Sequence, residues 1–279
     1  YSLTEITFEY LSPLKALHCY EFNECSSLTH FEVPSSVTRI EGYAFNQCTS
    51  LSEITFENPS SLKTICCYAF NDCNSLKQFE IPSTVEEIQK YAFNKCTSLS
   101  EVTFENFSTL KSLPPYVFNE CCLLTHLEVP SSVTRIEEHA FESSSLVKIK
   151  IPSSVTEIGK YCFNKCLLLI DVDIQSSSLT KIEEYTFNEC RALLQITIPS
   201  SVTEICGSSF SFCSSLTQVT LGSSVTKIGG SAFTGCISLV KVIIQSKITS
   251  IGGFAFSGCL SLEEITIPEG LTEIFDSTF

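Results

Sequence analysis

The apolar positions of this chain recur in a fixed order from one end to the other. After Phe22 they stand at Cys25, Leu28, Phe31, Val33, Val37, Ile40 and Ala44. Phe31 and Val33 alternate with the polar Glu32, which predicts a short strand with one buried face. Pro34 follows, and proline belongs just past a strand end because it cannot donate to a central ladder. The Pro-Ser-Ser sequence then turns the chain into a second extended segment at 37–40.

This unit is repeated along the whole chain. Equivalent phenylalanines are 22 to 25 residues apart, and in the first half intervals of 23 and 25 alternate to give a double unit of 48. Accordingly, LTHFEVPSSVTRIE at 28–41 returns as LTHLEVPSSVTRIE at 124–137. The phenylalanines that we expect to form a buried ladder are Phe22, Phe45, Phe70, Phe93, Phe118, Phe141, Phe163, Phe187, Phe210, Phe233, Phe256 and Phe279.

A repeat of this size predicts a solenoid. One unit is too small to bury its own leucine and phenylalanine, so neighbouring units must stack to complete a core. No segment keeps a 3.6-residue period long enough for a real helix. We therefore predict one β-rich domain over residues 1–279, with about 12 coils and one continuous parallel sheet. At a strand spacing of about 4.8 Å, the stack would be a curved rod of about 55 Å.

The consensus C-x-x-L-x-x-I-x-I-P-S-S-V-T-x-I-x-x-x-A-F resembles the BspA-type leucine-rich repeats, which are also found in treponemal proteins. The match runs from Leu3 to Phe279 and departs from the pattern locally, at Pro114-Pro115 and at 142–145. The family occurs in bacterial and protozoan-parasite surface proteins. The resemblance implies a leucine-rich repeat solenoid, a cell-surface or extracellular location, and attachment to a protein partner such as a host or matrix protein.

Composition narrows the classes of partner. The 31 acidic and 17 basic residues give a net charge of −14, which argues against nucleic acid or an anionic membrane. No apolar run is long enough for a transmembrane helix, so we expect no direct membrane insertion. The chain has no methionine and no signal-peptide pattern, and it starts and ends within a coil. It is therefore expected to be processed or to be a fragment of a longer array.

The sixteen cysteines fall into two groups. Ten share the repeat position of Cys25, and we expect them to be buried, reduced thiols that act as small apolar side chains. Six lie outside this register and leave open a bridge or two, with Cys19 and Cys67 as plausible members: Cys19, Cys66, Cys67, Cys122, Cys162 and Cys206. No C-x-x-C pair is present, so no zinc site is predicted.

The sequence shows no catalytic constellation. Its four histidines and its Gly-Gly pairs stand at repeat-defined positions, and no nucleophile–base pair or phosphate loop is recognisable. We expect neither enzymatic activity nor a cofactor. Asn106-Phe-Ser108 is a conventional glycosylation sequon in the loop of a 25-residue coil.

The remaining candidate is the solvent-facing side of the strands. Glutamate and threonine alternate there with the 48-residue block and form an acidic stripe over the first six coils. One interpretation is a platform for a basic protein or peptide, and the other is a face that is merely soluble. A further alternative is a structural protein that assembles head to tail through uncapped coils. The predicted partner-binding residues are Glu5, His30, Glu32, Glu53, Glu80, Glu101, His126, Glu128, Lys150 and Asp173.

Overall fold

The computed structural model describes residues 3–8, 12–244, 248–266, 269, 271 and 274–279. Within these residues the chain is a β-solenoid of about 11 turns with parallel sheets and no helix, as the repeat predicted. No helix in this described part could cross a membrane. The chain divides into two compact units, Tyr1–Val133 and Thr134–Phe279, and each unit is a stack of coils.

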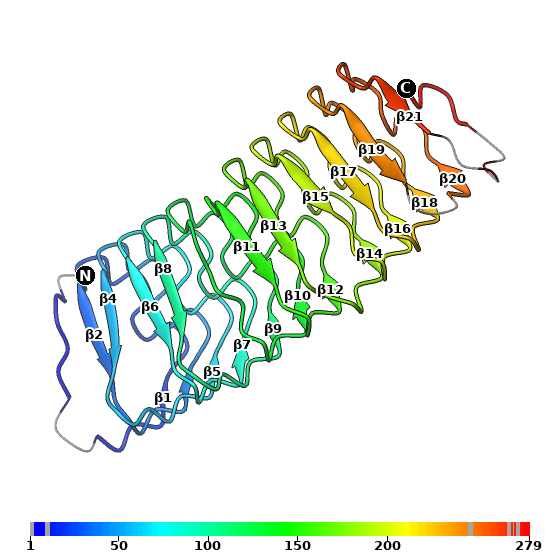
Figure 1. Cartoon of the computed structure of the whole chain (residues 1–279). Helices are drawn as coiled ribbons and strands as arrows, with labels where there is room; N and C mark the ends of the chain where they lie inside the picture. The colour runs from blue at the N-terminus through cyan, green and yellow to red at the C-terminus, as the bar shows by residue number, and fades with distance from the viewer. Residues whose placement is uncertain (1–2, 9–11, 245–247, 267–268, 270, 272–273) are drawn as a thin grey trace. The chain divides into compact units, whose positions relative to one another are not determined.

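In the first unit every complete coil contributes to two faces (Figure 1). The long-strand face carries the strands with alternating buried and exposed side chains, and the return face carries two-residue strands. The long strands are β2 (His30–Val33), β4 (Glu53–Phe56), β6 (Gln78–Ile81) and β8 (Glu101–Phe104). The return strands are β1 (Ala16–Leu17), β3 (Arg39–Ile40), β5 (Thr64–Ile65), β7 (Glu87–Ile88) and β9 (Ser112–Leu113).

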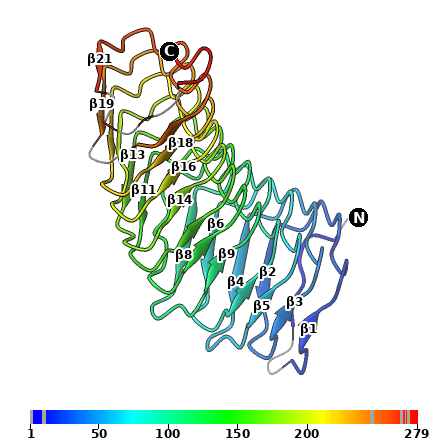
Figure 2. The same ribbon diagram turned by 90° about the vertical axis from the view of Figure 1, so that its right-hand side faces the viewer.

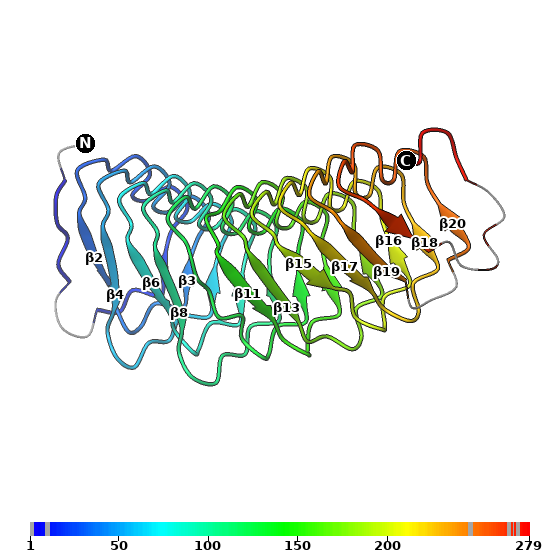
Figure 3. The same cartoon turned by 45° about the horizontal axis from the view of Figure 1, so that its top comes forward.

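The second unit is built in the same way (Figure 3). Its long strands are β11 (Lys148–Ile151), β13 (Asp171–Ile174), β15 (Gln195–Thr197), β17 (Gln218–Leu221), β19 (Lys241–Ile244) and β21 (Glu264–Ile265). Its return strands are β10 (Arg135–Ile136), β12 (Glu157–Ile158), β14 (Lys181–Ile182), β16 (Glu204–Ile205), β18 (Lys227–Ile228) and β20 (Ser250–Ile251), of which β14, β16 and β18 lie side by side in Figure 2.

The parallel ladder of the long strands is present as several shorter sheets. In the first unit β2 pairs with β4, and β6 pairs with β8. In the second unit β11 pairs with β13, and a four-stranded sheet is formed by β15, β17, β19 and β21. Each break inside a unit follows a coil that is longer than 23 residues. The coil that carries β4 has 25 residues and the coil that carries β13 has 24. The added residues enlarge the loop after the strand, and we attribute the loss of pairing to this larger loop.

Phenylalanine forms the spine of both cores. Ten ladder phenylalanines, Phe45 to Phe256, are buried. Their rings stack coil on coil with centroids 5.1–5.7 Å apart in the first unit. In the second unit the centroids are 5.3–5.8 Å apart. Phe22 is half-buried and Phe279 is 55% exposed, since each stacks on a single ladder neighbour among the described residues.

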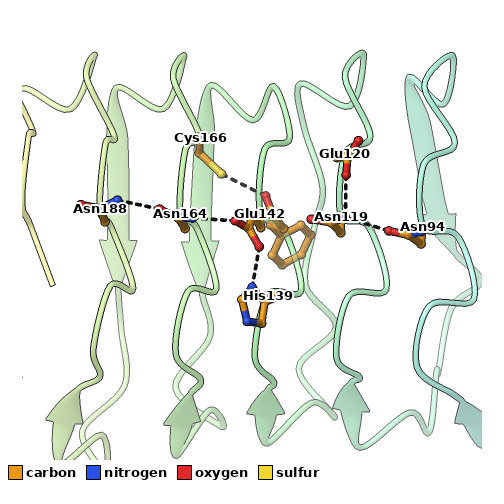
Figure 4. A network of polar contacts seen from close by, with 9 residues as sticks. Asn94, Asn119, Glu120, His139, Glu142, Asn164, Cys166 and Asn188 are labelled. Carbon is orange, nitrogen blue, oxygen red and sulfur yellow. Dashed lines mark hydrogen bonds and ion pairs between the residues drawn. The ribbon is translucent and has the colours of Figure 1, made fainter. Parts of the chain in front are cut away.

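Asparagine forms a second ladder that joins the coils. The Nδ2 of Asn94 donates to Oδ1 of Asn71 at 2.6 Å, and Asn119 donates to Asn94 at 2.7 Å. In the second unit Asn164 donates to Glu142 at 2.6 Å and Asn188 donates to Asn164 at 2.8 Å (Figure 4). The departure from the consensus at Glu142 thus keeps an acceptor in the ladder. Buried amides in such a chain satisfy one another, which a lone buried amide could not do.

The ladder cysteines are free thiols, and those from Cys48 to Cys259 donate a hydrogen bond to a backbone carbonyl of the preceding coil. Cys96 Sγ, for example, donates to the carbonyl oxygen of Phe70 at 3.1 Å, and Cys190 Sγ donates to that of Phe163 at 3.2 Å. Burial raises the pKa of Cys96 to about 12. These thiols are therefore protonated at neutral pH and hold the turn through weak hydrogen bonds.

The open alternative of a bridge among the cysteines outside the register is not found, because all sixteen cysteines are free thiols. The register places Leu17 beside Ile40 and Ile40 beside Ile65. Cys19 and Cys67 are therefore two coils apart, roughly 10 Å, which exceeds the reach of a disulfide. Each thiol instead donates to a side-chain oxygen one coil on, Cys19 to Glu41 at 3.4 Å and Cys67 to Gln89 at 3.2 Å.

Candidate partner-binding face

The long-strand face of the first unit carries eight of the ten predicted partner-binding residues. The strand pleat turns their side chains away from the core, while Phe31, Ile54, Phe79 and Val102 point inward and are buried. His30 is half-buried and the other seven are exposed. The eight are Glu5 ahead of β2, His30 and Glu32 on β2, Glu53 on β4, Glu80 on β6, Glu101 on β8, and His126 and Glu128 in the segment after β8.

Lys150 and Asp173 lie in the second unit, on β11 and β13. The parallel register sets Lys150 beside Asp173 and Lys148 beside Asp171. Neighbouring strands there carry opposite charges, so the local field cancels over this sheet. The acidic stripe predicted from the sequence is therefore a feature of the first unit.

The register explains how the first unit tolerates its negative charge. Glu32 lies beside Thr55 and Glu80 lies beside Thr103, so no two of these carboxylates are direct cross-strand neighbours. Glu53 lies beside His30 instead, with Nδ1 of the histidine 3.5 Å from Oε2 of the glutamate. Like charges directly opposite one another would destabilise the sheet. The alternation of glutamate and threonine in the 48-residue block separates them by one strand.

Two grooves cut into this acidic face. The first groove, of about 440 Å³, runs over β4, β6 and β8. Its charged lining residues are Glu53, Glu57, Glu80, Glu101 and Glu105, and none of the described lining residues is lysine, arginine or histidine. The second groove, of about 870 Å³, lies between β8 and residues 126–131. It shares Glu101 and Glu105 with the first groove and adds His126 and Glu128.

Each groove is lined in part by a 25-residue coil, the first groove by the coil of β4 and the second groove by the coil of β8. Glu57 and Glu105 stand in the enlarged loops after β4 and β8, and each carboxylate reaches back to the preceding coil. Glu57 accepts hydrogen bonds from the backbone N–H and the hydroxyl of Ser35, both at 2.9 Å. Glu105 accepts the same two bonds from Ser83, both at 2.8 Å. The bonds from the Ser35 backbone and hydroxyl lower the pKa of Glu57, so this carboxylate is ionised throughout the neutral range.

The second groove has an aromatic rim. Phe107 is 95% exposed and its backbone φ is +68°, a conformation that bulky side chains rarely adopt. Phe104 and Val129 lie half-buried in the same groove. Asn106, the residue of the predicted sequon, is exposed beside Phe107, where its glycosylation remains a prediction. The groove thus has an acidic wall and an apolar end, a combination that binding pockets use for orientation and affinity.

The chemistry of the described residues favours binding. No group of three or more His, Cys, Asp or Glu side chains in this part of the chain could hold a metal ion. The ladder thiols are poor nucleophiles, since burial raises the pKa of Cys48, Cys96 and Cys166 to about 12. An arrangement of fixed carboxylates on a rigid sheet can attract and orient a cation without any reaction.

Sequence reasoning missed a ladder of tyrosines, each of which stands three residues after a return strand of the first unit. Tyr20, Tyr43, Tyr68, Tyr91 and Tyr116 stack with ring centroids 4.4–4.8 Å apart and interplanar angles of at most 10°. All five have a φ near +60°. The signal was present, because tyrosine recurs two residues before each ladder phenylalanine in these coils. The same is true of the asparagines, which recur one residue after the phenylalanine.

Comparison with known proteins gives the repeat family. The family model for the BspA type leucine rich repeat region matches residues 15–123, 111–239 and 205–279. A leucine rich cell surface protein from Faecalibacterium prausnitzii has a crystal structure that is similar over 99% of this chain and 76% of its own, with 31% identity and a TM-score of 0.67. No curated protein matches the sequence.

Two further crystal structures show the same fold at lower identity. A leucine-rich repeat protein from Eubacterium ventriosum is 21% identical over 92% of this chain and 83% of its own, with a TM-score of 0.60. The pneumococcal vaccine antigen PcpA is 20% identical over 87% of this chain and 63% of its own, with a TM-score of 0.53. The solenoid architecture is therefore shared among proteins of low sequence identity.

Proposed function

Because the chain belongs to the BspA-type leucine-rich repeat family, we propose that its first unit is a non-enzymatic binding module for a basic protein or peptide. Leucine-rich repeats of this kind suggest a protein-interaction or surface role. The observation that carries the proposal is the acidic long-strand face, on which five glutamates line the first groove without a basic residue among its described lining. Such a face attracts basic partners and repels acidic ones.

The sheet suits this task because its inner and outer side chains are separate. Substitution of an outward glutamate leaves the phenylalanine and asparagine ladders intact, so the surface can vary on a constant core. The main chain of the face is held by neighbouring coils, and little ordering entropy is lost when a partner binds to it. Both features support a binding platform over a face that is merely soluble.

We place this module at a cell surface or outside the cell. The similar protein from F. prausnitzii is described as a leucine rich cell surface protein. The buried thiols are compatible with an oxidising environment, because protonated and inaccessible cysteines resist disulfide formation. A host or matrix protein with a basic surface is the partner class that this location favours.

The test replaces three glutamates on the face. Glu32, Glu80 and Glu128 are exposed and lie on alternate coils, so their change to lysine cancels the negative charge of the remaining stripe glutamates, Glu5, Glu53 and Glu101. Binding is measured against synthetic peptides of equal length whose net charge runs from acidic to basic, in about 0.15 M salt where charges act over roughly 8 Å. We expect the native protein to bind basic peptides, and the triple variant to bind them on the order of 100-fold less tightly.

The matched control makes the same change in charge elsewhere in the unit. Glu24, Glu86 and Glu87 are exposed and lie away from the long-strand face, Glu86 and Glu87 on the return side. Lysine is compatible with the backbone at Glu24, since Lys95 holds the equivalent position with the same φ of +59°. Equal loss of binding in both variants would mean that net charge, and not this face, attracts the peptide, and the proposal would be abandoned.

A further inference from the structure

The second groove interrupts hydrogen bonding along the long-strand face. In other coils of the unit the residue before each long strand donates its N–H to the preceding coil, as Ser52 does to Thr29 at 2.9 Å and Ser100 to Lys77 at 2.9 Å. Both β8 and residues 125–129 lie in the described part of the chain, and no backbone hydrogen bond joins them there. The edge of β8 that faces away from β6 is therefore open.

The segment across the groove is competent to form a strand. Residues 124–137 repeat residues 28–41 with one substitution, Phe31 to Leu127. In the first copy His30–Val33 forms β2 and pairs with β4 over four residues. In the second copy residues 126–129 have the same alternation, with Leu127 buried and Glu128 exposed, but they do not form a strand. These residues carry strand-forming side chains, but their backbone makes no hydrogen bond to β8.

Open edges with strand propensity are templates for an added strand. Proteins that recognise extended peptides use such edges, where main-chain hydrogen bonds give affinity and alternate side chains give specificity. The volume of about 870 Å³ lies within the range of roughly 300–1,000 Å³ that is typical of ligand pockets. Glu101, Glu105 and Glu128 set the charge of the occupant, and Phe107 offers it an exposed aromatic ring.

We propose that the second groove binds an extended basic peptide segment that pairs with the open edge of β8. Its lysine or arginine side chains would lie outward beside Glu101 and Glu128, and its alternate apolar side chains would contact Phe104, Phe107 and Val129. The proposal rests on the proposed function, because it names the form in which a basic partner meets the acidic face. It adds a requirement that charge attraction alone does not have, a hydrogen-bonding peptide backbone.

The test uses three peptides on the intact chain. The probe is Val-Lys-Ile-Lys-Ile, which is the sequence of residues 147–151 and alternates apolar with basic side chains. The second peptide has the same side chains with alternate amides N-methylated, and the third has glutamate in place of lysine. We expect the probe to bind, the N-methylated peptide to bind about 10- to 30-fold more weakly because its donors are lost, and the glutamate peptide not to bind.

Two further measurements locate the site. Amide hydrogen exchange is expected to slow at residues 101–104 and 125–129 when the probe is bound. Phe107→Ser is expected to weaken the probe about 3- to 10-fold without loss of stability, since the ring is almost fully exposed and Ser143 adopts the same backbone region. Glu86→Lys, on the return face, is the matched control and is expected to bind the probe normally.

The outcomes separate the two proposals. Equal binding of the probe and its N-methylated form, or exchange protection elsewhere, would overturn strand pairing while leaving the acidic platform in place. If the probe does not bind while other basic peptides do, strand pairing is likewise overturned and the acidic platform remains. Failure of every basic peptide would overturn both proposals.

Discussion

Deletion of one rung of the phenylalanine ladder tests the account of stability most directly. Phe163 is fully buried in the second unit, and its ring stacks on Phe141 at 5.5 Å and on Phe187 at 5.3 Å. Replacement of a buried phenylalanine by alanine typically costs about 3–5 kcal/mol. Each aromatic contact is worth about 0.5–1.5 kcal/mol beyond burial, so a site that loses two of them belongs in the upper part of that range.

The matched control is Phe212→Ala in the same unit. Phe212 is 53% exposed, so the same deletion removes less buried surface and leaves no internal cavity. We expect it to cost no more than about 1 kcal/mol. The φ of +58° at position 212 is equally unusual for phenylalanine and for alanine. The Phe212→Ala substitution should therefore leave the backbone strain at this position unchanged.

The assay is equilibrium urea unfolding followed by circular dichroism, combined with amide hydrogen exchange. In a solenoid each coil is stabilised by its neighbours, so Phe163→Ala should release exchange protection first in the coils of Phe141 and Phe187. A free energy of unfolding within about 1 kcal/mol of that of Phe212→Ala would refute the ladder as the source of stability. So would uniform loss of protection without a local origin.

Three other predictions concern the polar ladders. Asn94→Leu removes an amide that donates to one neighbour and accepts from another, and it should cost about 2–4 kcal/mol in urea unfolding, whereas Asn106→Ala, at an exposed site, should be neutral. A free energy of unfolding that is unchanged in Asn94→Leu would show that the asparagine ladder does not stabilise the fold. With Ellman's reagent, Cys19 and Cys122 should react first, because they are the two exposed thiols of sixteen; rapid reaction of all the thiols before unfolding would contradict their burial. Stability should also fall in alkali. Burial raises the pKa of Cys96 from 9.0 to about 12, so its contribution is complete below about pH 9 and is lost as the pH rises towards 12, by about 1 kcal/mol per pH unit. A urea midpoint that stays constant from about pH 8 to 11 would exclude this effect.

Much of the architecture could be predicted because the repeat is a local signal. Which residues of a coil turn inward depends on the pleat and on the turns, and both are written in a stretch of about 23 residues. The burial of Phe45 to Phe256 and the exposure of Glu32 and Glu80 follow from that pattern. Repetition then multiplies one assignment along the chain, so the fold class was accessible from the sequence.

The contacts between coils were harder to foresee. Asn94 stands in an Asn-x-Cys triplet whose role within its own coil is a turn, yet its partners are Asn71 and Asn119, 23 and 25 residues away. Cys19 and Cys67 were plausible members of a bridge only as long as the strand register, which separates them by two coils, was not known. Such pairs depend on which coil lies beside which, and on how the turns align across the stack.

The sequence alone determined the period, the inward phenylalanines and the sign of charge on the exposed strand positions, because each of these depends on neighbours in the chain. Only the tertiary structure decided that His30–Val33 pairs as β2 while the nearly identical residues 126–129 do not pair with β8. Two almost equal segments cannot differ through their own propensities. The difference depends on the neighbouring coils: β2 pairs with β4 in the coil after it, whereas residues 126–129 follow the 25-residue coil of β8, whose enlarged loop borders the second groove.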